Sequence, residues 1–330
     1  MRKLLLGTTA LAAAATLSAN AALADVSISG YYEWKYQSRS STVAANDGTS
    51  MSADSEIKVV FSNKTDSGLD ITMATEITAD DGDGGDIDES SLSIAGGFGK
   101  IVLGSDDNAA DNYGIDAEDV VGEEIQASGT STLSLTDTDL ETTGDANKIT
   151  YHIPAMGGLK AGISFTDNGT DSTTGSQDSI EMGAQYTMSA GGASITIGGA
   201  TSNTEQVSGT VDTESSNIGV SVTSGNITAK IAQSTYEATN KDEEANGVGV
   251  KIAISDGLSL GAYTIKVEDG TGTTDEEYTN TGAEVTYTIA SGLTAYFNIS
   301  DYDYKTGAGT GAGTTADSGT VSKLTIKATF

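Results

Sequence analysis

The sequence predicts an all-β fold: a sixteen-stranded antiparallel transmembrane β-barrel formed by residues 25–330. Three observations predict it. Apolar and polar residues alternate with a period of two in sixteen short stretches, as in strands with two different faces. Gly-rich tight turns alternate along the chain with long polar connections. A stretch of about ten residues, tilted in the barrel, is long enough to cross the hydrocarbon band of a membrane.

Residues 1–24 are expected to be a signal peptide. A basic start at Arg2 and Lys3 precedes an apolar run from Leu4 to Ala22, and small residues follow up to Ala24. This is the pattern of an exported protein cleaved after a small residue. The mature chain is therefore expected to begin at Asp25.

The sixteen alternating stretches follow one another over the rest of the chain. They are Val26–Gln37, Asp54–Asn63, Leu69–Ile77, Leu92–Ile94, Ile101–Leu103, Ile149–Ile153, Leu159–Phe165, Ile180–Met188, Ala193–Ile197, Ile218–Val222, Ile227–Ile231, Val248–Ile254, Leu258–Ala262, Val285–Ile289, Leu293–Ile299 and Leu324–Phe330. Ile265 and Val267 have the opposite parity to Leu258, which we interpret as a β-bulge. Leu133 and Leu135 are interpreted as an extra short strand.

The connections divide into two sets that alternate in length. The tight set is Asn63–Gly68, Gly96–Gly99, Pro154–Gly158, Ser189–Gly192, Ser224–Asn226, Ser255–Gly257 and Ala290–Gly292. The long set is Ser38–Ala53, Ala79–Asp86, Asp106–Ala146, Asp167–Gln177, Ser202–Glu214, Glu237–Asn246, Asp269–Tyr278 and Lys305–Gly319, and it is mostly acidic. We expect short periplasmic turns, long acidic extracellular loops and both ends of the mature chain at the tight-turn end.

The width of such a barrel determines which face meets lipid. Side chains cannot fill a sixteen-stranded cylinder, so its lumen holds water and the polar faces line it, while the apolar faces point outward. Aromatic residues of membrane barrels gather at the two interfaces. We expect such a girdle near the tight turns from Phe61, Tyr151, Tyr186, Tyr287 and Phe297, and another near the first long loop from Trp34 and Tyr36.

Composition excludes several other classes of protein. Acidic residues outnumber basic ones 47 to 16, which argues against nucleic-acid binding because phosphate contacts need Lys and Arg. The chain has no cysteine for thiolate chemistry or sulfur ligation of a metal. Its one histidine, His152, has the parity of the polar face and is interpreted as lumen wall. We therefore expect no enzymatic activity.

Three short segments and the last residue carry a resemblance to a known family. The segments are Asp25–Gly30 directly after the leader, Gly97–Gly104, and Ala109–Gly114; the last residue is Phe330. Together with the strand pattern, they make the chain resemble the general diffusion porins of Gram-negative outer membranes. The resemblance implies a homotrimer in outer-membrane lipids that lets small hydrophilic solutes and ions diffuse passively. It also implies that Phe330 serves in closure and assembly of the barrel.

The resemblance further implies that the third long loop, Asp106–Ala146, folds into the lumen and narrows it. Acidic residues that would then form the pore constriction are Asp106, Asp107, Asp111, Asp116, Glu118, Asp119, Glu123 and Glu124. The basic lumen wall opposite would be Lys35, Arg39, Lys58, Lys323 and Lys327. We expect the channel to favour cations. The alternatives are that the acids only solvate an extracellular loop and that the lysines only solvate the wall.

Two further hypotheses stay open from the sequence alone. Asp81, Asp83 and Asp86 form a candidate divalent site for Ca²⁺ or Mg²⁺, although the spacing fails as an EF-hand and a solvated turn is favoured. No other cofactor is expected. In place of a general channel, the chain could be a substrate-selective outer-membrane channel or a secreted structural or adhesive β-protein. A solenoid of the latter kind needs a fixed repeat, which the hairpins lack.

Overall fold

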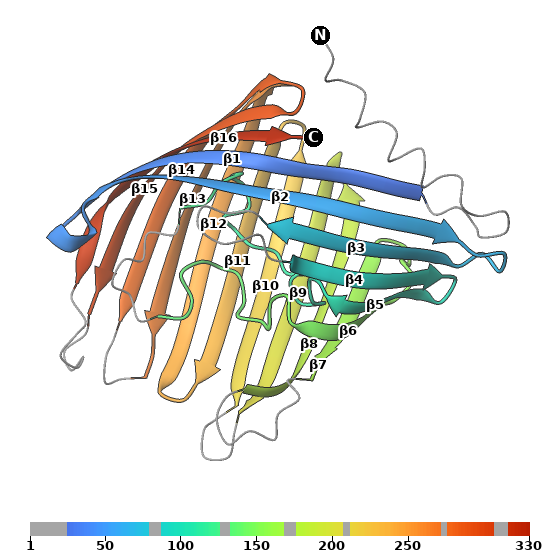
Figure 1. The fold of residues 1–330 in the computed structure, drawn as a ribbon. Coiled ribbons are helices and arrows are strands. Elements are labelled where there is room, and N and C mark those ends of the chain that lie inside the picture. The colour runs from blue at the N-terminus through green and yellow to red at the C-terminus, as the bar shows by residue number, and fades with distance from the viewer. Residues whose placement is uncertain are drawn as a thin grey trace, which may run out of the picture.

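The structure is a computed structural model, and it describes residues 25–78, 87–125, 133–167, 176–206, 212–271, 276–306 and 316–330. These residues form one closed antiparallel barrel of sixteen strands in which each strand pairs with its neighbours in the sequence (Figure 1). β16 closes the ring on β1, and Gly30 and Phe330 exchange backbone hydrogen bonds of 3.3 and 2.9 Å. The predicted fold class and the predicted pairing of the last segment with the first are confirmed.

The strands carry most of the described chain. They are β1 (Asp25–Ser41), β2 (Gly48–Lys64), β3 (Asp70–Thr78), β4 (Ile87–Gly96), β5 (Gly99–Ser105), β6 (Asn147–His152), β7 (Leu159–Thr166), β8 (Ser176–Ala190), β9 (Ala193–Gln206), β10 (Thr213–Ser224), β11 (Ile227–Ala238), β12 (Lys241–Ser255), β13 (Leu258–Asp269), β14 (Glu277–Ala290), β15 (Leu293–Lys305) and β16 (Asp317–Thr329). A single 3-10 turn, η1 (Ala44–Asn46), joins β1 to β2. Among the described residues, no helix is long and apolar enough to span a membrane.

The two faces of the wall differ as the alternation predicts. Large apolar side chains are exposed on the outside, for example Ile28 at 59%, Ile231 at 57% and Phe297 at 51%. Polar residues such as Glu33 and Ser164 point inward and are buried. Burying apolar area is the main favourable term in water, so this inverted distribution is stable only with lipid outside.

Two of the predicted long loops are wrong, because the strands continue through them. β1 and β2 pair up to Arg39 and Gly48, leaving only residues 42–47 between the two strands of the expected loop Ser38–Ala53. β11 and β12 likewise pair up to Ala238 and Lys241, within the expected loop Glu237–Asn246. Both faces of these extensions are largely polar, so the period-two pattern of apolar residues disappears although backbone pairing continues.

The predicted bulge at Ile265 and Val267 is also wrong. β13 pairs with β14 in unbroken register from Leu258 to Glu268, and the register shift on its other side lies at Ala253 and Ser255 of β12. Ile265 and Val267 instead point into the lumen, where they are 1% and 0% exposed. At this end of β13 the outward positions are polar and the inward positions are apolar. The side chains still alternate between the two faces without a break, but the apolar residues have moved from the outward face to the inward one.

These inward apolar residues belong to a core formed with the third long loop. Buried partners are Tyr278, Tyr302, Tyr304 and Val321 of the neighbouring strands and Val120, Ile125, Leu133 and Leu135 of the loop. Leu133 and Leu135 were predicted to form an extra strand, and this is wrong: neither lies in a strand. Burial against the barrel wall accounts for their alternation.

The orientation of the wall predicts opposite effects of one substitution on its two faces. Ile231→Arg places a charge on the outward face of β11 and is expected to lower the free energy of unfolding by about 2–4 kcal/mol, the cost of arginine near the middle of a bilayer. Ser221→Arg on the lumen face of the adjacent strand β10 is the matched control and should change stability little. Urea unfolding in lipid vesicles measures both. Equal losses in the two variants would contradict the assignment of faces.

Candidate functional site

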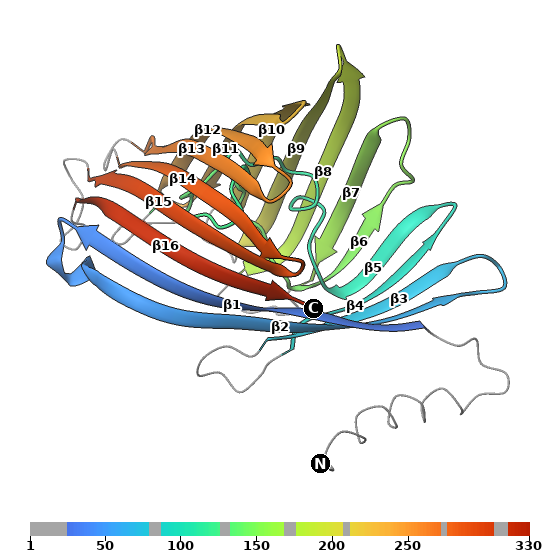
Figure 2. The ribbon, with the colours of Figure 1, turned by 90° about the horizontal axis from the view of Figure 1, so that it is seen from above.

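The segment between β5 and β6, residues 106–146, is called loop 3 from here on, and its described parts, residues 106–125 and 133–146, lie inside the ring of strands (Figure 2). Its outgoing part, residues 106–125, passes β7, β10 and β14 in turn, as contacts with Ser164, Asn217 and Glu284 show. Its returning part, residues 133–146, passes back along β12, β10 and β8. The described parts of loop 3 therefore cover one side of the inner wall in two layers.

A row of lumen-facing glycines makes room for the outgoing layer. A β-carbon added at Gly183, Gly198, Gly219 or Gly261 would lie 2.5–2.6 Å from a backbone oxygen of loop 3. Real side chains do not approach so closely, so any other residue at these positions would push the loop away from the wall. The glycines lie on β8, β9, β10 and β13, and together they form a shallow seat for loop 3.

Three buried wall carboxylates hold the loop backbone in this seat. Glu284 accepts the N–H groups of Gly122 and Glu123 at 2.8 and 2.9 Å. Glu243 accepts those of Ser134 and Leu135 at 2.8 Å. Glu181 accepts the N–H of Thr143 at 2.7 Å. Hydrogen bonds to ionised acceptors are stronger than neutral ones, and here they satisfy loop N–H groups that have no strand partner.

Two side chains tie the layers of loop 3 to each other. Asn217 of β10 is 4% exposed and bonds both layers: its Oδ1 accepts the N–H of Ile115, and its Nδ2 donates to the carbonyl of Thr138. Glu118 in the outgoing layer accepts the N–H and hydroxyl of Thr138 in the returning layer at 3.0 and 2.7 Å. These hydrogen bonds connect the two layers directly.

The predicted constriction acids do not all face the lumen equally. Glu118 is buried within the loop as the tie just described, while Asp107, Asp111 and Asp119 are exposed. The half-buried ones are Asp106, Asp116, Glu123 and Glu124. Of these eight acids, only Asp119 and Glu123 form ion pairs with described residues. Asp119 lies 2.7 Å from Lys230, and Glu123 lies 3.2 Å from Lys323.

The residues predicted to form the basic wall lie on β1, β2 and β16, and every lysine among them is paired with an acid. Lys35 lies 2.7 Å from Glu33, and Lys327 bonds the other oxygen of the same carboxylate. Lys58 is paired with Glu76, and Lys323 with Glu123 of loop 3. Arg39 stacks on the ring of Tyr302 at 4.9 Å. The wall thus carries far less net positive charge than its lysines suggest.

Burial raises the pKa of several loop 3 acids, of Asp111 and Asp137 to about 7 and most strongly of Asp116 and Glu124. Burial raises the pKa of Asp116 to about 9, with Asp139 and Glu118 adding to the shift through repulsion. Burial likewise raises the pKa of Glu124 to about 9, with added repulsion from Glu118 and Asp137. Both groups are therefore mostly protonated at neutral pH.

One group of carboxylates could hold a divalent cation. Glu89 of β4 and Asp107 and Asp145 of loop 3 place oxygens within 4.8 Å of one another, and Ca²⁺ and Mg²⁺ take such ligands. Asp107 and Asp145 are exposed, which is equally the arrangement of a solvated acidic surface. The candidate site predicted at Asp81, Asp83 and Asp86 lies outside the described residues.

The sequence analysis missed the residues that hold loop 3 in place. His152, interpreted only as lumen wall, has its Nδ1 2.7 Å from the hydroxyl of Tyr113 in the loop. The seat glycines were not singled out either. Glycines with lumen parity on β8, β9 and β10 are the signal that could have identified the seat, because a strand has no other reason to lack a side chain on its polar face.

A closed sixteen-stranded barrel with an apolar exterior and a polar loop folded into its lumen defines the class of membrane β-barrel channels. A family model described as Gram-negative porin matches residues 7–307. The chain belongs to this family, whose members are outer-membrane channels rather than enzymes.

Solved structures share the fold at low sequence identity. An anion-selective porin from Comamonas acidovorans matches with a TM-score of 0.70 and 16% identity over 93% of this chain and 100% of its own. The outer membrane protein OmpT of Vibrio cholerae, folded in vitro in a trimer form, matches with a TM-score of 0.65 and 16% identity over 93% and 99%. A mutant of the Rh. blastica porin matches with a TM-score of 0.65 and 16% identity over 93% of this chain and 100% of its own. Curated protein sequences gave no match.

The seat predicts that adjacent glycines of β9 respond differently to the same change. In Gly198→Val the new side chain collides with loop 3, so we expect the loop to shift and the barrel to lose about 1–3 kcal/mol, the usual cost of overpacking. Gly199→Val is the matched control, since its β-carbon would meet only the carbonyl of Asn217 at 3.5 Å. Single-channel conductance and urea unfolding measure the two effects. Equal conductance in both variants would contradict the seat.

Proposed function

We propose that this protein is a channel for passive diffusion of small hydrophilic solutes and ions across the outer membrane, and that it favours cations. The observation that carries the cation preference is the imbalance of unpaired charge at loop 3. Asp106, Asp107 and Asp111 form no ion pair among the described residues, whereas the lysines opposite are paired with acids of the wall. Fixed charge in a narrow lumen concentrates mobile ions of the opposite sign.

Charge placement, and not the fold, decides this preference. The Comamonas acidovorans porin shares the fold and is described as anion-selective. In this chain, Glu33 accepts both Lys35 and Lys327, and Asp54 lies 3.5 Å from Lys35, so the two wall cations face two acids. Lys323 is pulled onto Glu123 of loop 3, which removes one charge from each side of the constriction. The remaining excess at loop 3 is negative.

The channel also has a proposed orientation and assembly in the membrane. We place the tight turns in the periplasm and the long acidic loops outside the cell, with residues 1–24 removed on export. A homotrimer is proposed because OmpT, which shares the fold, has a solved trimer form. No cofactor is needed for diffusion, and the exposed group Glu89, Asp107 and Asp145 is left as solvated acid.

Selectivity is expected to depend on pH mainly through the two loop acids whose pKa values are raised furthest. Asp116 and Glu124 have pKa values of about 9, so they gain negative charge as the pH rises from about 7 toward 10. The ratio of cation to anion permeability should therefore increase over this range. Reversal potentials across a KCl gradient in planar bilayers measure it, and anion preference at neutral pH would contradict the proposal.

A double variant separates this effect from the titration of lysines, which begin to lose charge near pH 10. Asp116→Asn with Glu124→Gln removes both ionisable groups and should flatten the increase between pH 7 and 9.5. Asp66→Asn, in the tight turn between β2 and β3 and away from loop 3, is the control that should leave the increase intact. An unchanged increase in the double variant would assign the pH dependence to other groups.

A further inference from the structure

Three lysines line the lumen along the edge of loop 3 that faces the tight turns. Lys160 of β7 comes two residues before Gly162, against which Tyr113 of loop 3 packs. Lys251 of β12 comes two residues after Gly249, against which Val120 of loop 3 packs. Because side chains alternate, each lysine occupies the next lumen-facing position toward the tight turns. Lys100 of β5 follows the tight turn of its own hairpin directly.

Lys100, Lys160 and Lys251, called the vestibule lysines from here on, have no ion pair within the part of the chain that the structure describes. Their cross-strand neighbours are mostly uncharged: Lys160 is paired in register with Gln185, and Lys251 with Thr228. Lys100 and Lys160 are exposed and Lys251 is half-buried. Their charge therefore acts on the ions in the lumen.

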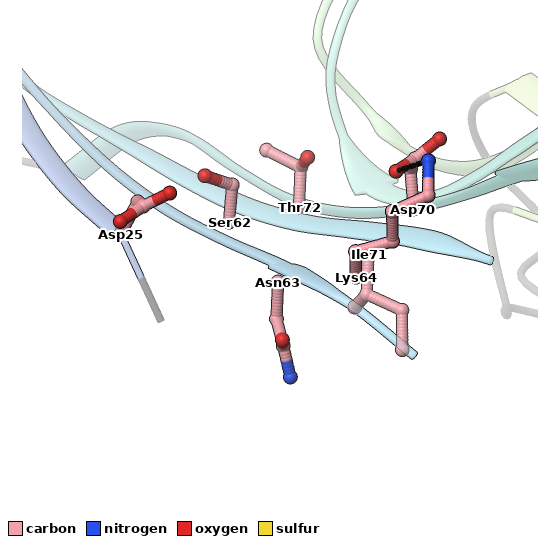
Figure 3. Close-up of a pocket in the computed structure, with 7 residues that line it drawn as sticks. All are labelled: Asp25, Ser62, Asn63, Lys64, Asp70, Ile71 and Thr72. Atoms are coloured by element: carbon pink, nitrogen blue, oxygen red, sulfur yellow. Dashed lines mark hydrogen bonds and ion pairs between the residues drawn. The ribbon is translucent and has the colours of Figure 1, made fainter. Parts of the chain in front are cut away.

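The other lysines near this end are neutralised by acids. Lys64 lies at the end of β2 with its Nζ 2.9 Å from Asp70, and Figure 3 shows the two side chains meeting beside a hollow at the ends of β1, β2 and β3. Lys230 is bound to Asp119 of loop 3, and Lys327 to Glu33. The vestibule lysines are thus distinct from the basic wall described above.

The fixed charge of the lumen consequently changes sign along the barrel axis. At loop 3, Asp106, Asp107 and Asp111 make it negative; one step toward the tight turns, the vestibule lysines make it positive. Cations are the majority mobile ions beside the acids, and anions are the majority beside the lysines. A voltage that is positive at the long-loop end drives both majority ions toward the boundary between the layers, where they accumulate. The opposite voltage drives both away and depletes the boundary.

We propose that this stacked arrangement of acidic loop 3 and the vestibule lysines makes the channel rectify, passing more current when the long-loop end is positive. The proposal rests on the proposed function, since it needs a conducting channel. Rectification means that the current depends on the sign of the voltage, which neither the net charge nor the cation preference of the channel would cause. Biologically, the device would favour entry of cations from the long-loop side and oppose their loss.

Single-channel currents of the full-length mature protein in symmetric KCl test the proposal. At about 0.1 M salt, where the screening length is about 10 Å, we expect currents at opposite voltages to differ about 1.5-fold or more. At about 1 M, where it is about 3 Å, the ratio should fall close to about 1. Orientation is established with Ser291→Cys in the β14–β15 turn, since the chain has no other cysteine, and a membrane-impermeant charged thiol reagent added to one chamber.

The vestibule lysines are tested by the triple variant Lys100→Gln, Lys160→Gln and Lys251→Gln. It should lose most of the current asymmetry while still conducting. The control, Lys266→Gln with Lys305→Gln, removes lysines from the outward face and should keep the asymmetry. Symmetric currents in the unaltered protein at low salt, asymmetry of the opposite sense, or unchanged asymmetry in the triple variant would overturn the proposal.

Reversal potentials in the same bilayers distinguish this failure from failure of the proposed function. Cation preference together with symmetric currents would overturn rectification alone. Correctly folded protein that forms no conducting channel would overturn both.

Discussion

Closure of β1 on β16 is the constraint on which the rest of the structure depends. An unpaired backbone group in lipid costs several kcal/mol, so the ring must close, and Gly30 and Phe330 exchange the hydrogen bonds at the seam. A closed ring of sixteen strands is too wide for its own side chains to fill. The lumen must therefore hold water or another part of the chain. Loop 3 takes part of that space, which only a ring of this width leaves free.

The sequence predicted the fold wherever lipid imposes a pattern. Val250 and Phe297 were assigned to the outward face because apolar residues alternate there, and both are exposed on the outside of the barrel. Beyond the lipid band this pattern fails. The β1–β2 hairpin continues through Ser38 and Gly48 with polar residues on both faces, so pairing leaves no hydrophobic signal. Ile265 was misinterpreted for the related reason that its apolar side chain packs on loop 3 instead of lipid.

The seat of loop 3 could not be derived from the sequence, because it exists only when distant strands are adjacent. Gly183, Gly198 and Gly219 are separated by hairpins and mean nothing individually, but the register of β8, β9 and β10 aligns them under the loop backbone. Glu284 is similar: one acid on a polar face predicts a solvated wall, yet it accepts two loop N–H groups more than 160 positions away. Contacts between residues so far apart in the chain alter neither the composition nor the periodicity of the sequence, so the sequence alone does not reveal them.

Counting charged residues therefore gives a misleading picture of the lumen. The sequence suggested a wall of lysines facing an acidic loop, a transverse arrangement. The structure pairs Lys35 and Lys327 with Glu33, so much of the transverse difference cancels within the wall itself. In the proposed device the unpaired charge is separated along the axis instead, with Asp107 and Asp111 at loop 3 and Lys160 and Lys251 toward the tight turns. Ions crossing such a channel would meet these layers in series, so the order of the layers would act on every ion, whichever side of the lumen it follows.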